Sequence, residues 1–232
     1  MILAAGLGTR LKPFTENHPK ALYPVNNKSL LQRNIEYLKK YGVTDIIVNV
    51  HHFAEQIINT LQENNGWGAK ITISDETNEV LETGGGLKKA AHFFENTNEP
   101  FLLLNADILT DLNIEAMLQY HNSTNALATL AITERSTSRY LLFNESNTLC
   151  GWLNDKTGEQ KGITGNRKAF SGIHIISPKI FSLITEEGKF SMIDLYIRLS
   201  QSQTIKGFDH SNGILVDVGK PENVPFAEQH FL

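Results

Sequence analysis

The chain has 232 residues, of which 41% are hydrophobic and 20% are charged. This balance is typical of a globular protein and excludes a disordered chain and a fibrous repeat. The net charge of −4 provides no general field to attract nucleic acid or an anionic membrane, so a polyanionic ligand must be held locally.

The first half of the chain alternates predicted strands with predicted helices. A buried strand over 1–5 runs into a glycine turn, and Ser29 with Gln32 forms a capping box for a helix that Gly42 ends. The elements that follow are a strand at 46–50, a helix through 57–61 ending near 66, a strand at 70–74, a chain break at the glycine triplet 84–86, a helix at 87–94 and a strand at 101–104. Uniformly apolar strands that alternate with helices predict an α/β fold with a doubly wound, mostly parallel sheet.

Beyond residue 113 the pattern changes. A helix to about 121 and a strand over 126–133 precede a predicted hairpin of 140–143 with 149–152, and the polar stretch 155–168 is interpreted as a flap or mobile loop. A strand at 172–176, a helix after Pro178, a capped helix from Ser191, a strand at 214–218 and a helix near Pro221 complete the chain.

The glycine turn is the first candidate site. Gly6 and Gly8 precede Arg10, and turning N–H groups beside a basic residue suit a phosphate, although the same glycines also suit a simple tight turn. The segment lacks the third glycine of a dinucleotide fingerprint and the G-K-[ST] of a Walker loop, which weakens both of those interpretations.

Five segments in order carry a stronger signal. They are Met1 to Pro13 with Pro19-Lys20 and Pro24-Val25, then Glu82-Thr83-Gly84-Gly85-Gly86, Asn105-Ala106-Asp107, Phe170-Ser171-Gly172-Ile173 and Val216-Asp217-Val218-Gly219. Over nearly the whole chain they resemble the signature of the sugar-1-phosphate nucleotidyltransferases, the nucleotide-diphospho-sugar pyrophosphorylases. Among these, the chain is most similar to short bacterial N-acetylmuramate-1-phosphate uridylyltransferases and mannose-1-phosphate guanylyltransferase-like enzymes.

The resemblance implies a Rossmann-like nucleotidyltransferase domain over 1–232, with a small β-rich insertion at about 135–170 on the sugar side. It implies a reaction in which a sugar 1-phosphate attacks the α-phosphorus of a nucleoside triphosphate, giving a nucleotide-sugar and pyrophosphate. The implied partners are these two small molecules, with no nucleic acid and no membrane. The base could be that of UTP, GTP or CTP, and the sequence does not indicate the sugar or the oligomeric state.

The resemblance also assigns site residues. Arg10, Lys20 and Asp107 are the implied catalytic residues, and Asp107 with Asp217 would hold Mg²⁺, an ion that takes few protein ligands beside phosphates. Ala106 replaces a glycine that commonly precedes the first aspartate. The implied substrate-binding residues are Ala4, Ala5, Gly6, Leu7, Gly8, Thr9, Glu82, Thr83, Gly84, Gly85, Asn105, Ser171 and Gly172. A basic residue of the second half should grip the sugar phosphate, and Arg139, Arg167 and Lys168 are the candidates.

Two polyanionic reactants need concentrated positive charge, since unit charges about 4 Å apart repel by about 4 kcal/mol at an effective dielectric of about 20. The attacking phosphate oxygen is already ionised near neutral pH, so no general base is required.

Two other functions stay open. A cytidylyltransferase for phosphocholine would need an aromatic cage, for which Trp67, Trp152 and Phe170 are available. A regulatory subunit that binds nucleotide-sugar without turnover would not need the intact charged set. The single cysteine, Cys150, and the absence of a predicted signal or membrane segment predict a cytoplasmic location.

Overall fold

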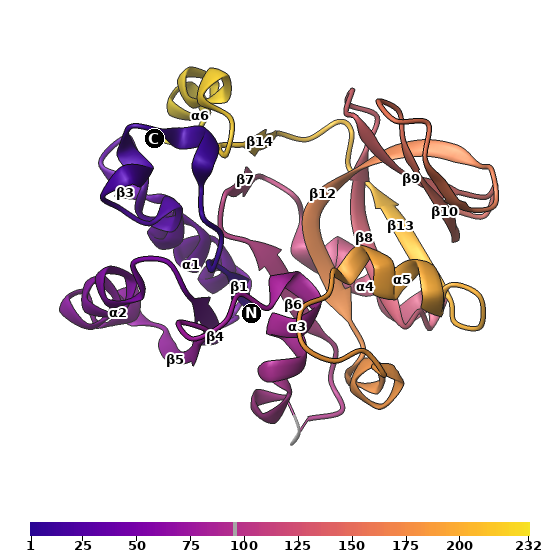
Figure 1. The fold of residues 1–232 in the computed structure, drawn as a ribbon, viewed down its shortest axis with the longest axis horizontal. Helices are drawn as coiled ribbons and strands as arrows, with labels where there is room; N and C mark the ends of the chain where they lie inside the picture. Colours follow the sequence, from indigo (N-terminus) through magenta and orange to yellow (C-terminus); the bar gives the residue numbers. More distant parts are fainter. Residues whose placement is uncertain (95–96) are drawn as a thin grey trace.

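The computed structural model describes residues 1–94 and 97–232 and combines a parallel half with an antiparallel half (Figure 1). One ten-stranded sheet runs through both halves in the order β11-β10-β9-β12-β6-β1-β4-β5, and off this path β8 pairs with β12 while β13 pairs with β8. In Figure 1 the parallel half, indigo to magenta, lies to the left of the antiparallel half.

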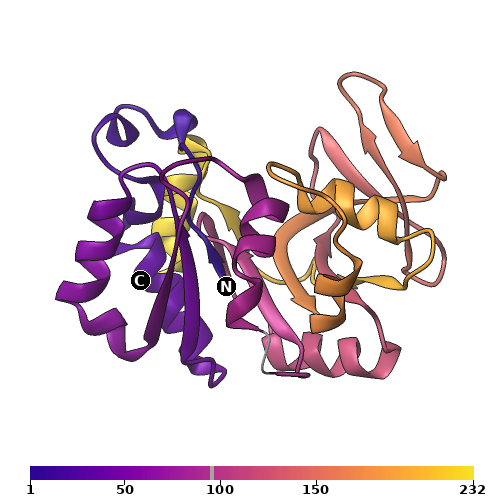
Figure 2. The same cartoon turned by 60° about the horizontal axis from the view of Figure 1, so that its bottom comes forward.

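The parallel half confirms the predicted alternation. Its strands are β1 (Ile2–Leu3), β4 (Asp45–Val50), β5 (Lys70–Asp75) and β6 (Phe101–Asn105). Its helices are α1 (Leu30–Lys40), α2 (Ala54–Glu63) and α3 (Glu82–Lys89), whereas α4 (Ile114–Thr124) packs on β8, β12 and β13. Ile46 and Val48 pack with α1 and α2, whereas Ile47 packs with α3, so alternate strand residues feed a core on each face. Figure 2 shows α2 and α3 on opposite sides of these strands, as a doubly wound sheet requires.

The antiparallel half is organised around one long strand, β12 (Asn166–Ile176), which pairs with β6, β8 and β9. The other elements of this half are β8 (Ala128–Thr133), β9 (Arg139–Phe143), β10 (Leu149–Asn154), β11 (Gln160–Gly162), β13 (Ile205–Asp209) and α5 (Met192–Leu199). The predicted hairpin is confirmed as β9 with β10. The flap interpretation of 155–168 is wrong in part, because β11 and the start of β12 pair with β10 and β9 there.

A small two-stranded sheet joins the end of the chain to the parallel half. β7 (Ile108–Thr110) pairs antiparallel with β14 (Leu215–Asp217), and α6 (Val224–His230) follows. β14 packs through Val216 against Val25 and Leu109 in a small core of its own, near the β2 (Pro24–Val25) and β3 (Lys28–Ser29) pair. The strand predicted at 214–218 therefore lies outside the main sheet, because this apolar contact draws β14 onto β7.

The predicted chain break at the glycine triplet 84–86 is wrong, because these glycines lie inside α3. A Cβ on Gly84 would come within 2.4 Å of the Phe190 ring, and one on Gly85 within 2.3 Å of the Gly188 carbonyl oxygen. These glycines let α3 pack closely on the loop before α5, and that packing offsets their poor helix propensity. After Pro178 the chain forms a 3-10 turn, Pro178–Leu183, rather than an α-helix.

Candidate active site

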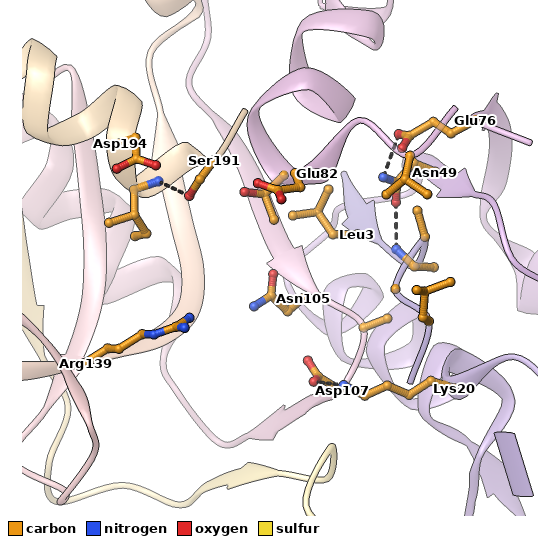
Figure 3. Close-up of a pocket in the computed structure, with 18 of the residues that line it drawn as sticks. Leu3, Lys20, Asn49, Glu76, Glu82, Asn105, Asp107, Arg139, Ser191 and Asp194 are labelled. Carbon is orange, nitrogen blue, oxygen red and sulfur yellow. Dashed lines mark hydrogen bonds and ion pairs between the residues drawn. The ribbon is translucent and has the colours of Figure 1, made fainter. Parts of the chain in front are cut away.

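A cleft of about 640 Å³ opens between the two halves, at the carboxyl ends of β1, β4 and β6. Figure 3 shows its two walls, with Lys20, Asp107, Asn49 and Glu76 on one side and Arg139 and Asp194 on the other. Open α/β sheets bind ligands at this edge, where strand order reverses around the first strand.

The glycine turn forms part of the floor of the cleft. Ala4, Ala5, Gly6 and Leu7, four of the residues predicted to bind substrate, line it. The Ala4 N–H donates to Asn49 Oδ1 at 2.7 Å, which fixes the start of the turn against β4.

Gly8, Thr9 and Arg10 lie just beyond the lining. Gly8 has a φ of +66°, and a Cβ there would come within 2.8 Å of Lys20 Cβ, so the turn requires glycine at this position. Thr9 and Arg10 begin a 3-10 turn, Thr9–Leu11, and both are exposed.

The three implied catalytic residues meet at one point. Lys20 Nζ contacts Asp107 Oδ2 in an ion pair whose side chains are only 17% and 16% exposed. A Cβ on Gly219 would lie 2.5 Å from Lys20 Nζ, 2.8 Å from Asp107 Oδ2 and 2.9 Å from Arg10 Nη2. The ends of all three side chains therefore surround the Gly219 backbone.

Two hydrogen bonds to backbone carbonyls fix the position of Asp107. The carbonyl of Ala106 accepts a hydrogen bond of 2.9 Å from the buried amide of Asn34 in α1, and the Asp107 carbonyl accepts 2.9 Å from the Val218 N–H. These bonds fix the turn between β6 and β7 on which the carboxylate stands.

Asp217 is brought beside Asp107 by the β7–β14 ladder, in which Asp217 lies opposite Ile108. Its Oδ1 accepts a 3.0 Å hydrogen bond from the Gly219 N–H, and Asp217 does not itself line the cleft. The Asp107 carboxylate on the turn before β7 and the Asp217 carboxylate at the end of β14 form a donor set that suits Mg²⁺, with phosphate oxygens and water as the remaining ligands. Across the described part of the chain no group of three or more His, Cys, Asp or Glu side chains gathers around a common point, so a pair is what the chain offers.

The predicted segment 82–85 contributes two residues to the cleft and two to the packing of α3. Glu82 and Thr83 line the cleft, and Glu82 has a φ of +58°, a left-handed conformation that is uncommon outside glycine. Thr83 Oγ1 accepts a 2.9 Å hydrogen bond from the Met192 N–H at the start of α5. Gly84 and Gly85 are buried in the packing of α3 and do not line the cleft.

Of the remaining predicted binding residues, only Asn105 lines the cleft. Ser171 is buried, and its hydroxyl lies 2.8 Å from His210 Nε2, away from the lining. Gly172 supports the site indirectly, since its φ is +76° and a Cβ would come within 2.8 Å of the Asn105 amide.

Among the basic candidates of the second half, only Arg139 lines the cleft. Arg167 pairs with Asp155 at 2.9 Å, and Lys168 pairs with Glu134 and Asp209 at 2.8 and 2.7 Å. Both are therefore engaged elsewhere.

Sequence reasoning missed a buried carboxylate in the cleft wall, Glu76. It is 1% exposed, its Oε1 accepts from Asn49 Nδ2 at 2.8 Å, and burial raises its pKa above the ordinary range. Among the described residues its Oε2 has no hydrogen-bond partner. The signal that could have found it is an acidic residue that follows the strand predicted at 70–74.

The aromatic cage that phosphocholine would need does not form. Trp152 lines the cleft, Trp67 packs on the core beneath the parallel half, and Phe170 contacts His174 edge-on. The three rings thus belong to separate surroundings.

No helix in the described ranges, 1–94 and 97–232, is long and apolar enough to cross a bilayer.

Comparison with known proteins places these features in context. The family described as "Nucleotidyl transferase" matches residues 1–140. Mannose-1-phosphate guanyltransferase 2 of Candida glabrata is 30% identical over 225 residues, which is 96% of this chain and 62% of that protein. The chain thus spans about three fifths of the length of this relative.

Two solved structures extend the comparison. HddC from Yersinia pseudotuberculosis complexed with GMP-PN is 28% identical, with a TM-score of 0.80 over 100% of this chain and 98% of that one. UDP-glucose pyrophosphorylase from Acinetobacter baumannii is 17% identical, with a TM-score of 0.80 over 99% and 91% of the two chains, a likeness of fold.

Proposed function

Because the chain belongs to the nucleotidyl transferase family, we propose that it transfers a nucleoside monophosphate from a nucleoside triphosphate to a sugar 1-phosphate. The observation that carries this proposal is the meeting of Arg10, Lys20 and Asp107 around Gly219, beside the glycine turn. Two cations and a carboxylate at the mouth of a cleft that carries an open glycine loop suit phosphate chemistry.

In the proposed reaction an oxygen of the sugar phosphate forms a bond to the α-phosphorus as the bond from that phosphorus to pyrophosphate breaks. Lys20 is placed to leave Asp107 for the α-phosphate, where a compact ammonium opposes the growing charge. Arg10 presents a planar fork to the departing β- and γ-phosphates. Arg139, on the opposite wall, is the cation that would hold the acceptor phosphate in line.

Asp107 and Asp217 would hold Mg²⁺. When bound, this ion neutralises phosphate charge and orients the reacting oxygens. The Gly219 N–H holds the Asp217 carboxylate in a fixed direction, because it donates to Oδ1 and leaves Oδ2 for a ligand. No side chain is needed as a general base, since the attacking phosphate is ionised near neutral pH.

We further propose GTP as the donor. Guanine presents two adjacent donors, N1–H and the 2-amino group, whereas uracil presents one donor between two acceptors. In the proposed complex the Glu76 carboxylate, which lines the parallel wall of the cleft, accepts from the guanine edge. The Candida glabrata relative named as a guanyltransferase and the GMP-PN complex of HddC support the same choice. We place the enzyme in the cytoplasm on the evidence of its single, unpaired cysteine.

The test is a matrix of GTP, UTP and CTP against mannose, glucose and N-acetylmuramic acid 1-phosphates, scored by pyrophosphate release. We expect release only when both substrates and Mg²⁺ are present, with GTP preferred, and loss of release in Asp107→Asn with the fold retained. Release from a triphosphate alone would indicate a hydrolase. Binding of nucleotide-sugar with no release for any pair would indicate the regulatory alternative.

A further inference from the structure

The end of the cleft that lies in the antiparallel half carries an aromatic ring within a set of charged groups. Trp152 on β10, Lys161 on β11 and Asp194 on α5 all line this end, which we call the aromatic end. The indole packs partly against the core of the antiparallel half. Lys161 Nζ lies over it, 5.3 Å from the ring centroid.

The charges of the aromatic end are engaged with one another. Lys161 Nζ is 2.7 Å from Asp194 Oδ1 and 3.8 Å from Glu159 Oε1, and these side chains are 42%, 59% and 55% exposed. An ion pair this open to water contributes little to stability, so its side chains can exchange partners at low cost. The aromatic end therefore combines a flat apolar surface with movable donors and acceptors at its rim.

This composition does not suit a phosphate group. One ammonium faces two carboxylates, so the aromatic end carries a net negative charge. Nor is it the natural place for the base, because nucleotides bind above the carboxyl ends of parallel strands, which here are β1, β4 and β5. The acceptor must then extend from the phosphates into the antiparallel half.

We propose that Trp152 is the platform on which the acceptor sugar ring stacks, with Lys161 and Asp194 exchanging their mutual contact for the sugar hydroxyls. This inference rests on the proposed function and assigns the acceptor subsite within it. A pyranose has an apolar face of C–H groups and a rim of hydroxyls, which match the indole face and the charged rim. The Lys161 ammonium that lies over the ring before binding keeps that face covered until a sugar displaces it.

The chain contains two tryptophans, which allows a direct test. In Trp67→Phe all tryptophan emission comes from Trp152 in an unaltered cleft, whereas Trp152→Phe leaves only Trp67 beneath the parallel half. The probes are the nucleotide-sugar that the substrate matrix identifies and the matching nucleoside diphosphate, which differ only in the sugar. We expect the nucleotide-sugar, but not the diphosphate, to change the emission of Trp67→Phe, and neither to change that of Trp152→Phe.

Kinetics provide the second readout. Trp152→Leu should raise KM for the sugar 1-phosphate about tenfold, the effect of losing contact with roughly 50 Å² of apolar surface. KM for the triphosphate should stay within about twofold of wild type. If leucine at 152 unfolds the hairpin, the emission experiment still tests the inference, because Trp67→Phe keeps the native Trp152.

Three outcomes would overturn the inference while leaving the proposed function intact. They are equal emission changes with the diphosphate alone, no change with either probe, and a Trp152→Leu variant that folds with an unchanged KM for the sugar phosphate. If the matrix yields no pyrophosphate from any pair, the proposed function itself fails.

Discussion

Replacing Gly219 by alanine should lower the rate of the proposed reaction and leave the stability of the fold nearly unchanged. A Cβ there would sit 2.5 Å from Lys20 Nζ, 2.8 Å from Asp107 Oδ2 and 2.9 Å from Arg10 Nη2. Ordinary contact begins near 3.4 Å, so the ammonium must move by about 1 Å. A displacement of this size in a phosphate-positioning group costs about a hundredfold in rate, or about 2.7 kcal/mol of barrier.

Stability should change little in the same variant. Each crowded atom is the end of a side chain that can turn into the cleft, and Gly219 does not have the positive φ that would strain an alanine. The Lys20–Asp107 contact can shift into the cleft without being lost, and the reduced entropy of the unfolded chain contributes about 0.4–1 kcal/mol of stability. At about 2–4 °C per kcal/mol, Tm should stay within a few degrees of wild type.

Gly213→Ala is the matched control. Its Cβ would come within 2.7 Å of the end of one carboxylate, Asp111 Oδ1, outside the cleft. Pyrophosphate release and thermal unfolding should be measured for both variants. Full activity in Gly219→Ala would refute the idea that the groups around this glycine must keep their positions, and so would equal losses in the two variants.

Four further predictions follow from the same geometry. Lys20→Met should lower kcat by several powers of ten, because its charge acts mainly in the transition state; an effect on KM alone in initial-rate kinetics would contradict that role. Asp217→Asn keeps an oxygen for the Gly219 N–H, so it should raise the Mg²⁺ concentration needed for half-maximal activity without lowering Tm, and an unchanged Mg²⁺ titration would remove this residue from the metal site. Glu76→Gln should reduce the preference for GTP over UTP about tenfold or more in competition assays, because the amide oxygen would stay bound to Asn49 and an NH2 donor would replace the Oε2 acceptor; an unchanged ratio would place guanine elsewhere. Burial lowers the pKa of His174 from 6.5 to about 3, so between these two pH values the unfolded chain binds a proton that the folded protein excludes. The free energy of unfolding should therefore fall by about 1.4 kcal/mol for each pH unit below pH 6.5, down to about pH 3. In denaturant titrations His174→Gln should flatten this slope, and the control His230→Gln, at an exposed histidine, should not.

Much of the parallel half could be predicted from the sequence because its signals are local. The helix cap at Ser29 can be recognised from residues 29–32 alone. The structure confirms this cap, because Ser29 Oγ accepts a 3.1 Å hydrogen bond from the Gln32 N–H. Apolar runs such as Ile46 to Val50 identify buried strands by themselves. The glycine turn is likewise visible, since Gly8 is required by its own φ.

The parts that could not be predicted depend on partners distant in the chain. The glycines of α3 look like helix breakers until the loop at 188–190, about one hundred residues later, packs on them. Asp217 reads as a strand residue from its neighbours, but whether its strand enters the main sheet is decided by Leu109 and Val25. Trp152 and Asp194 belong to different elements, and their common cleft follows only from the placement of α5 beside β10.

The division of labour between the two halves suggests how one fold can serve different acceptors. The family match ends at residue 140, and residues 1–140 contain the glycine turn, Lys20, Glu76 and Asp107, the groups that we propose to face the triphosphate. Trp152, Lys161 and Asp194 come from the remaining chain and sit on a hairpin and a helix that do not hold the phosphate centre. Two ladders join the second part to that centre: β14 pairs with β7 and carries Asp217 and Gly219, and β12 pairs with β6, which leads into Asp107. Changes in the hairpin can therefore alter the fit to the proposed sugar without moving the charges proposed to act on the α-phosphorus, provided that these two ladders stay in register.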